Sequence, residues 1–156
     1  MKYKFLSDEE LEILENELLQ FLIVNGIDGA EWKRINEEKP DKALELIGLF
    51  SDLVWQRSLE KAQCGDIITD NQYLIFQFRK EEIELFGLRC TNKISANNFS
   101  DFVSCLKTNP SGLDLIHQTK TYKMSREEEI FSMMNNGLLL CDQANFDFLK
   151  NLYNNA

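Results

Sequence analysis

The side chains that could perform nucleophilic chemistry are four cysteines and a single histidine, His117. A thiol becomes a useful nucleophile when a neighbouring base takes its proton, and imidazole is the usual base. The sequence therefore leaves open a small cysteine-dependent enzyme or a thiol sensor in which His117 acts with Cys90 or Cys105. The spacing of these residues does not show that their side chains meet, so a packed or surface histidine is the simpler interpretation.

The same residue types do not follow the spacing of a metal or nucleotide site. Successive cysteines are 26, 15 and 36 residues apart, whereas zinc ligands usually come in close pairs. The seven glycines form neither a dinucleotide-binding fingerprint nor a phosphate-binding loop. We therefore expect no metal and no cofactor. Binding of a small ligand in a pocket under a sheet remains a third alternative.

Charge is the more informative property of this chain. It has 156 residues and a formal net charge of -9, and residues 1–60 hold 14 acidic and 7 basic side chains. Phosphate backbones and anionic lipid headgroups repel such a surface, so we expect no direct DNA binding and no membrane binding. A protein partner with a basic surface matches this charge.

The acidic residues near the N-terminus are not balanced by basic residues one helical turn further on. Glu12, Glu15 and Glu17 have no Lys or Arg at the fourth position after them. These three carboxylates are either a docking surface for a basic partner or a solvated helix face. Trp32 is a candidate anchor for the same contact, with core packing as the alternative.

Capping signals predict a helical N-terminal part. Ser7 and Glu10 form a capping box, Gly26 favours a helix end, and Asp28 with Glu31 forms a second capping box. Helices are expected over residues 8–25, 28–39 and 40–63.

The pattern changes from helical to extended after residue 63. The residues Cys64-Gly65-Asp66 interrupt the chain, and two alternating segments, 72–79 and 82–90, predict a β-hairpin turning at Lys80-Glu81. The other expected elements are a helix over 96–107 capped by Ser95, a turn over 109–112, a strand over 113–119, a helix capped by Ser125, an apolar link over 138–141 and a helix from Asp142 to about Tyr153.

These elements predict one α+β domain over residues 1–156, with a helical part over 1–63 and a mixed part over 64–156. Its three N-terminal helices pack on a small, mainly antiparallel sheet, and a C-terminal helical pair follows. The longest apolar stretch, Leu18 to Val24, is too short for a membrane helix, and the start of the chain lacks a signal-peptide core. A cytoplasmic protein with reduced thiols is expected.

Several segments resemble a known family: Phe21–Ile27, Glu31-Trp32, Glu38–Pro40, Gly48–Trp55 and Asn136–Leu139. The chain is similar, over nearly its whole length, to a family of small acidic proteins of unknown function from flavobacteria and related Bacteroidota. The resemblance brings no catalytic motif and implies an association with the ribosome. We therefore predict a bacterial, non-catalytic interaction protein or accessory subunit of a larger cytoplasmic assembly, of unknown oligomeric state.

Overall fold

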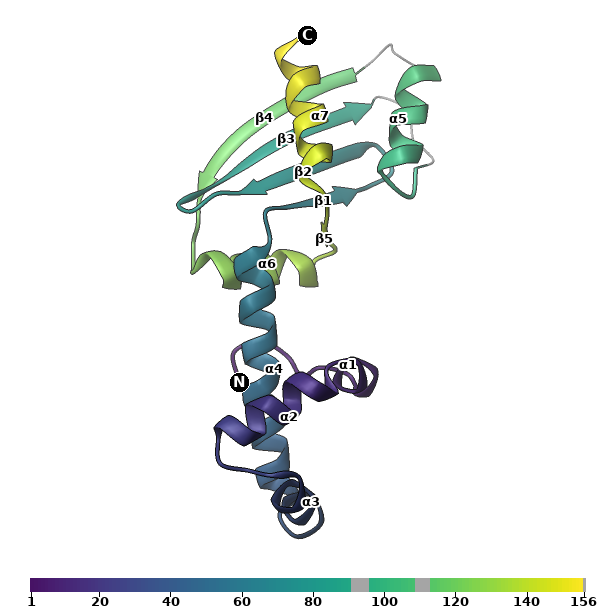
Figure 1. Ribbon diagram of the computed structural model, residues 1–156. Helices are drawn as coiled ribbons and strands as arrows, with labels where there is room; N and C mark the ends of the chain where they lie inside the picture. The colour runs from purple at the N-terminus through teal and green to yellow at the C-terminus, as the bar shows by residue number, and fades with distance from the viewer. Residues whose placement is uncertain (91–95, 109–112, 156) are drawn as a thin grey trace. The chain divides into compact units, whose positions relative to one another are not determined.

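The computed structural model describes residues 1–90, 96–108 and 113–155 (Figure 1). The chain forms two compact units, Met1–Glu60 and Lys61–Ala156. The predicted change from a helical to a mixed part falls within three residues of this division. The α+β class is confirmed, because helices occur in both units and an antiparallel sheet in the second. The prediction of a single domain stays a prediction.

The N-terminal unit is built from α1 (Asp8–Ile13), α2 (Glu15–Val24), α3 (Gly29–Glu38) and α4 (Pro40–Lys61). The prediction of one continuous helix over 8–25 is wrong, because the backbone at Leu14 leaves the helical region with φ -99° and ψ 21°. The break lets Leu11 and Leu14 pack against the same core as Leu18. The second and third predicted helices are confirmed as α3 and α4.

The predicted caps are found, with one difference. The Ser7 hydroxyl accepts from the Glu10 backbone N–H at 3.2 Å, and the Glu10 carboxylate accepts from the Ser7 N–H at 2.7 Å. Asp28 caps α3 by accepting from the Glu31 N–H at 2.8 Å. The second box is not reciprocal, however, since the Glu31 carboxylate forms an ion pair with Arg34 instead.

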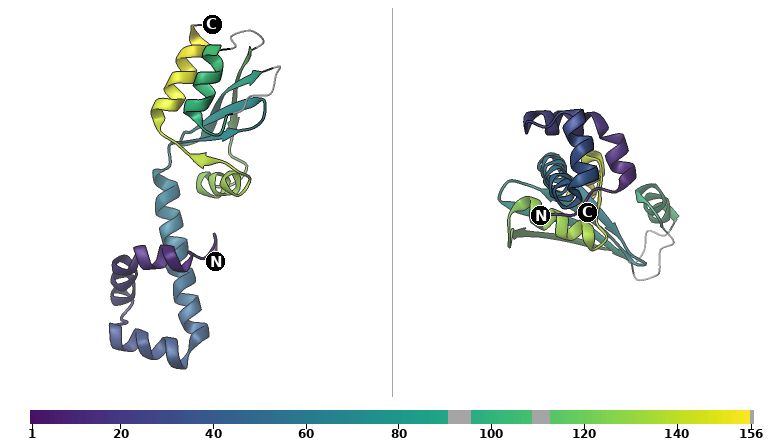
Figure 2. Two further views of the ribbon diagram at one scale, coloured as in Figure 1. Left: turned by 90° about the vertical axis from the view of Figure 1, so that its right-hand side faces the viewer. Right: turned by 90° about the horizontal axis from the view of Figure 1, so that it is seen from below.

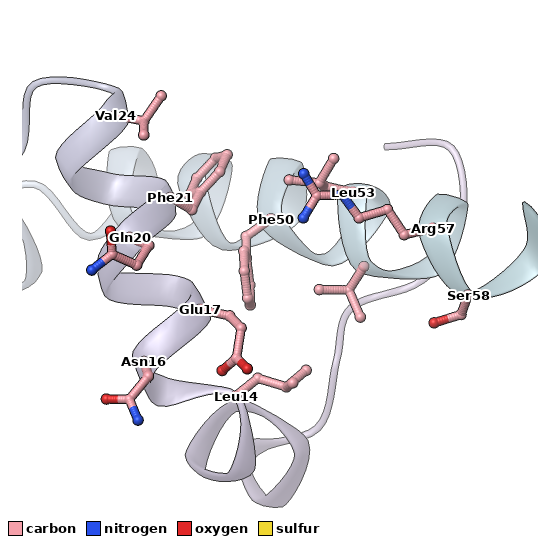
Figure 3. A pocket seen from close by; sticks show the side chains of 11 residues that line it. Leu14, Asn16, Glu17, Gln20, Phe21, Val24, Phe50, Leu53, Arg57 and Ser58 are labelled. Atoms are coloured by element: carbon pink, nitrogen blue, oxygen red, sulfur yellow. The ribbon is translucent and has the colours of Figure 1, made fainter. Parts of the chain in front are cut away.

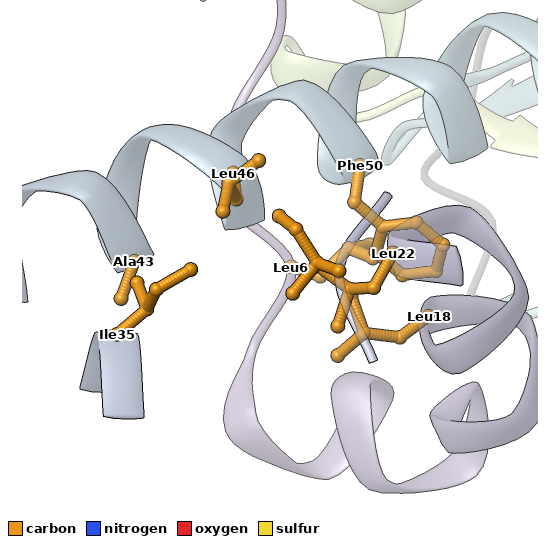
Figure 4. Packing of buried hydrophobic residues seen from close by; sticks show 8 residues of the cluster. Leu6, Leu18, Leu22, Ile35, Ala43, Leu46 and Phe50 are labelled. Atoms are coloured by element: carbon orange, nitrogen blue, oxygen red, sulfur yellow. The ribbon is translucent and has the colours of Figure 1, made fainter. Parts of the chain in front are cut away.

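The core of the N-terminal unit lies where the other helices and the first residues of the chain pack on α4 (Figure 4). Asp52 on α4 accepts hydrogen bonds from the backbone N–H groups of Lys2 and Tyr3. These bonds hold the N-terminal segment along the helix. The buried cluster consists of Leu6, Leu18, Leu22, Ile27, Ile35, Ala43, Leu46 and Phe50.

The second unit contains the strands β1 (Cys64–Ile68), β2 (Gln72–Phe78), β3 (Glu82–Cys90), β4 (Leu113–Thr121) and β5 (Leu139–Leu140). Counted over the described residues, they form a five-stranded antiparallel sheet in the order β4-β3-β2-β1-β5. The hairpin of β2 and β3 and the strand β4 are confirmed, and β4 is two residues longer than predicted.

The interpretation of Cys64-Gly65-Asp66 as a break is wrong, because these residues begin β1. Gly65 lies inside the sheet, where a Cβ atom would stand only 2.5 Å from Cδ2 of Leu138. The glycine therefore permits close packing rather than a turn. The predicted apolar link over 138–141 contains β5, which pairs with β1.

The helices of this unit are α5 (Phe99–Thr108), α6 (Arg126–Asn135) and α7 (Gln143–Asn154), and α5 and α7 cover one face of the sheet (Figure 2). Asn98 caps the start of α5, because its side chain accepts from the Asp101 N–H at 2.9 Å. This cap lies three residues after the predicted cap. Ser125 caps α6 as predicted. The predicted cap Ser95 and the turn over 109–112 lie outside the described residues.

Of the helices in the described ranges, none combines the length and the apolar character needed to cross a lipid bilayer.

Candidate functional site

An open groove runs between α2 and α4 in the N-terminal unit and encloses about 540 Å³ (Figure 3). Its floor is apolar: the ring of Phe50 is 2% exposed and packs 5.5 Å from the ring of Phe21. The rim is open, because Val24 is 84% exposed. The lining residues are Leu14, Asn16, Glu17, Gln20, Phe21, Val24, Phe50, Leu53, Val54, Arg57 and Ser58.

One acidic and one basic side chain stand on opposite walls of the groove. Glu17 projects from α2, and Arg57 extends along α4 beside Leu53 (Figure 3). Both residues are exposed. Within the described part of the chain neither forms a hydrogen bond or an ion pair, so both charges are available to a ligand.

The other two predicted acidic residues lie outside this groove. Glu12 and Glu15 line a shallow hollow with Asp8 and Leu11. Like Glu17, they have no hydrogen-bond or ion-pair partner among residues 1–90, 96–108 and 113–155. The structure thus keeps the three carboxylates unpaired, as the sequence indicated, but places Glu17 in a different concavity from Glu12 and Glu15.

Trp32 lies on α3 and is not part of the groove lining. Its ring is partly buried and packs against the hydrophobic cluster of the N-terminal unit. Core packing therefore accounts for the buried part of the Trp32 side chain. Sequence reasoning missed Arg57 and the apolar lining, although the many apolar residues between Leu44 and Trp55 were a signal for the lining.

In the second unit, His117 is engaged by neighbours on the sheet. Its Nε2 atom lies 3.1 Å from Oε1 of Glu84, and its ring stacks on Phe86 with centroids 4.4 Å apart. Cys90 lies four positions along β3 from Phe86, the register partner of His117. Four residues of strand span about 13 Å, so the imidazole is not placed beside this thiol.

Cys90 and Cys105 interact electrostatically with each other. Burial, and secondly the proximity of Cys105, raises the pKa of the Cys90 thiol above its usual range. A thiol with a raised pKa is a weak nucleophile at neutral pH. The thiol chemistry predicted for these residues stays a prediction, and the geometry supplies no base for Cys90 from His117.

The structure brings together two other cysteines, which no sequence pattern connects. The Sγ atoms of Cys64 and Cys141 are 3.5 Å apart, and the backbone N–H of Cys141 donates to the carbonyl of Cys64 at 3.1 Å. Both thiols are free. Burial is the main cause that raises the pKa of each.

A buried acid lies on the same strand as Cys64. Asp66 accepts a hydrogen bond from the Tyr73 hydroxyl at 2.8 Å, and burial raises the pKa of its carboxyl although this bond lowers it. Across the described residues, no three His, Cys, Asp or Glu side chains gather closely enough to hold a metal ion.

These features define a small α+β protein with an apolar, charge-flanked groove in its helical unit and a pair of buried thiols in its sheet unit. A model of a family described as a family of unknown function (DUF6495) matches residues 1–154, and the chain belongs to this family. The resemblance to a family of unknown function is thereby confirmed. Comparison with curated proteins and with solved structures found no match.

Proposed function

We propose that this protein is a non-catalytic interaction protein or accessory subunit of a larger cytoplasmic assembly, and that the groove between α2 and α4 receives a helix of its partner. The observation that supports this most strongly is the open apolar groove with unpaired charges on its rim. Grooves of this kind accept the apolar face of an amphipathic helix.

The dimensions of the groove match a short helical segment. The lining residues along α2 run from its N-cap residue Leu14 to Val24, a distance of about 15 Å at the rise of an α-helix. A partner helix of about three turns would fill that length, with apolar residues at positions i, i+3 or i+4, and i+7. Val24 and Leu53 would contact those residues above the buried ring of Phe50.

The charges favour a partner that is basic overall. A Lys or Arg beside the apolar stripe of the partner would meet Glu17, and further basic residues would meet Glu12 and Glu15 beyond the groove. The excess of acidic over basic residues in 1–60 adds a long-range attraction that accelerates association at low salt. Arg57, on the other wall, would fix the direction of the partner helix by meeting an acidic side chain.

The binding test uses a synthetic amphipathic helix with a leucine stripe flanked by lysines, and a matched peptide in which glutamates replace the lysines. Fluorescence anisotropy measures both affinities at low and high salt. We expect the basic peptide to bind more tightly and to weaken as salt rises. Equal binding of both peptides would contradict the charge argument.

Substitutions separate the groove from general electrostatics. Val24→Asp places a charge on the apolar rim and is expected to abolish binding, and Glu17→Lys is expected to weaken it about ten-fold. Glu45→Lys changes the net charge equally at an exposed position of α4 outside the groove, so it should weaken binding much less. Loss of a dimer on Val24→Asp, seen by sedimentation, would assign the groove to a second copy of the chain instead.

The assembly itself is tested in cell extracts, beginning with the ribosome that the family resemblance implies. The protein carrying Glu12→Lys, Glu15→Lys and Glu17→Lys is compared with wild type and with Glu45→Lys for cosedimentation with ribosomes at low and high salt. We expect the triple variant to remain in the supernatant. Cosedimentation that is the same for all variants and at every salt concentration would overturn the proposed contact.

A further inference from the structure

The second unit holds two thiols whose positions favour bond formation. We infer that Cys64 and Cys141 form an intramolecular disulfide when the protein meets a hydroperoxide, so that the β1–β5 edge of the sheet is an oxidation-responsive site. The inference is independent of the groove and rests on the juxtaposition of these two residues in the sheet.

The backbone already holds the two cysteines as opposing residues. The ladder of β1 and β5 pairs Asp66 with Leu139 and Gly65 with Leu140. The next pair along the ladder is Cys64 with Cys141, which are joined by the N–H to carbonyl hydrogen bond of 3.1 Å. Opposing residues of antiparallel strands have Cα atoms about 4.5–5.5 Å apart, within the range that disulfides span.

The side chains need only a small adjustment. The sulfurs are 3.5 Å apart in the reduced protein, and a disulfide bond is about 2 Å long. The Cys64 thiol donates to the Cys141 carbonyl at 2.9 Å, and this contact would be given up when the sulfur turns toward its partner. The movement is a side-chain rotation and leaves the strand pairing in place.

Access decides which sulfur reacts first. Cys141 is partly exposed, whereas Cys64 is 1% exposed. The Cys141 thiol loses its proton, and the resulting thiolate attacks an oxygen of the hydroperoxide. The S–O bond forms and the O–O bond breaks. The leaving oxygen takes up the proton and departs as an alcohol, or as water when the oxidant is hydrogen peroxide. Cys64 then attacks the Cys141 sulfur, the S–S bond forms, the S–O bond breaks, and water leaves with the Cys64 proton. The two thiols lose two electrons together, and the hydroperoxide gains them.

The surroundings set the speed of this reaction. Burial raises the pKa of both thiols, with the nearby acids Asp66 and Asp142 adding to the effect and Asp147 also acting on Cys64. Thiolate is the reacting form. Oxidation is therefore slow near neutral pH and accelerates as the pH rises, so the pair responds to sustained rather than brief exposure.

The bond would reinforce a weakly held edge. The strand β5 has two residues, and Asp142, which follows Cys141, is the N-cap residue of α7 but makes no capping hydrogen bond with its side chain. A Cys64–Cys141 bond ties both β5 and the start of α7 to β1. Amide exchange over residues 138–145 should become slower in the oxidised protein.

The test treats the reduced full-length protein with hydrogen peroxide, blocks the remaining thiols and maps disulfides by mass spectrometry. Wild type, Cys90→Ser and Cys105→Ser are each expected to gain one intramolecular disulfide between the peptides that contain Cys64 and Cys141. Cys141→Ser should gain none. Because the wild-type map is direct, the result does not depend on whether a variant folds.

Three outcomes would overturn the inference. The first is that all four thiols remain reduced after long exposure. The second is a bond between Cys90 and Cys105 while Cys64 and Cys141 stay unmodified. The third is that disulfides form only between separate chains. Slower amide exchange over residues 138–145 in oxidised wild type, but not in peroxide-treated Cys141→Ser, would support the proposed reinforcement of the β1–β5 edge. None of these outcomes bears on the groove.

Discussion

The acidic residues near the groove differ in their partners from those of the sheet unit, although Glu31 in the N-terminal unit is also paired, with Arg34. In the N-terminal unit, Glu12, Glu15 and Glu17 stand without partners among the described residues. In the second unit, Glu84 contacts both Arg79 and His117, and Glu129, which is 5% exposed, forms an ion pair with Lys120 at 2.6 Å. Residues 61–156 also hold nearly balanced charge, with 12 acidic and 10 basic side chains.

Apolar residues show a related difference. The N-terminal unit leaves Ile13, Val24 and Leu49 at least half exposed, and part of this surface forms the groove. In the sheet unit, α5 and α7 cover one face of the sheet over Tyr73 and Phe86. The difference in apolar exposure is one of degree, because Met124 and Leu139 in the second unit are also at least half exposed. What distinguishes the N-terminal unit is that part of its exposed apolar surface lies beside unpaired charges in a groove, a combination suited to contact other molecules.

The largest expected effect comes from removing one buried ring in each unit. Phe50→Ala and Phe146→Ala each empty a site that is at most 2% exposed and should cost about 3–5 kcal/mol of unfolding free energy. Hydrogen exchange read by mass spectrometry locates the damage. We expect faster exchange mainly in residues 1–60 for Phe50→Ala and mainly in 61–155 for Phe146→Ala.

An equal rise throughout the chain for both variants would show that the two units unfold together as one domain. Phe148→Ala, at a ring that is 41% exposed, serves as the control with a smaller loss.

Glu129 tests the internal pairing of the second unit. Burial raises the pKa of its carboxyl, but hydrogen bonds from Lys120 and from the Lys123 backbone outweigh this and hold the pKa below its usual range. Glu129→Gln should therefore cost about 1.5–3 kcal/mol at about pH 7. Denaturant unfolding measures the change.

The pH dependence has a definite sign. A carboxyl whose pKa is lowered by folding stabilises the protein above its unfolded pKa, and this stability is lost as the pH falls through the folded value. The difference between wild type and Glu129→Gln should thus shrink in acid. A difference that stays constant to about pH 3 would indicate that shape rather than charge is responsible.

Asp66 should show the reverse dependence. Burial raises the pKa of this carboxyl, so its protonated form stabilises the fold at low pH and that stability is lost as the pH rises through the folded value. Asp66→Asn keeps an acceptor for Tyr73 and removes the charge. As the pH rises, the unfolding free energy of Asp66→Asn should increase relative to that of wild type. This gain should be smaller than the loss caused by Glu129→Gln, and denaturant unfolding measures both.

Glycine substitutions compare packing in the two units. A Cβ at Gly65 would stand 2.5 Å from Cδ2 of Leu138 and 3.0 Å from the Leu139 carbonyl oxygen, whereas a Cβ at Gly29 would meet nothing within 4 Å. Gly65→Ala should cost about 1–3 kcal/mol through overpacking. Gly29→Ala should be neutral or slightly stabilising. Equal melting temperatures for the two variants would contradict the tight β1–β5 contact.

The smallest effect on stability is expected at the three unpaired carboxylates of the proposed binding surface. Glu12→Gln, Glu15→Gln and Glu17→Gln remove charges that have no partners among the described residues, so each should change the unfolding free energy by no more than about 0.5 kcal/mol. The same substitutions should weaken binding of the basic peptide. A large loss of stability at Glu17 would show that this carboxylate serves the fold.

Local signals explain which elements could be predicted. The cap of Ser7 with Glu10, the left-handed Gly26 at φ 78°, the helix α4 and the hairpin of β2 and β3 each depend on residues within a few positions of one another. Their patterns are therefore visible in the chain. The unpaired state of Glu12, Glu15 and Glu17 was also visible, because helical neighbours are three or four residues apart.

Tertiary structure alone decided the break at Leu14, the strands β1 and β5, the groove and the approach of Cys64 to Cys141. The two cysteines are separated by 77 positions. The strand β5 has only two residues, and the five residues of β1, Cys-Gly-Asp-Ile-Ile, do not alternate between apolar and polar. What brings such segments together is the packing of side chains such as Leu138 against Gly65. Contacts of that kind depend on the whole folded chain, so no short stretch of sequence contains them.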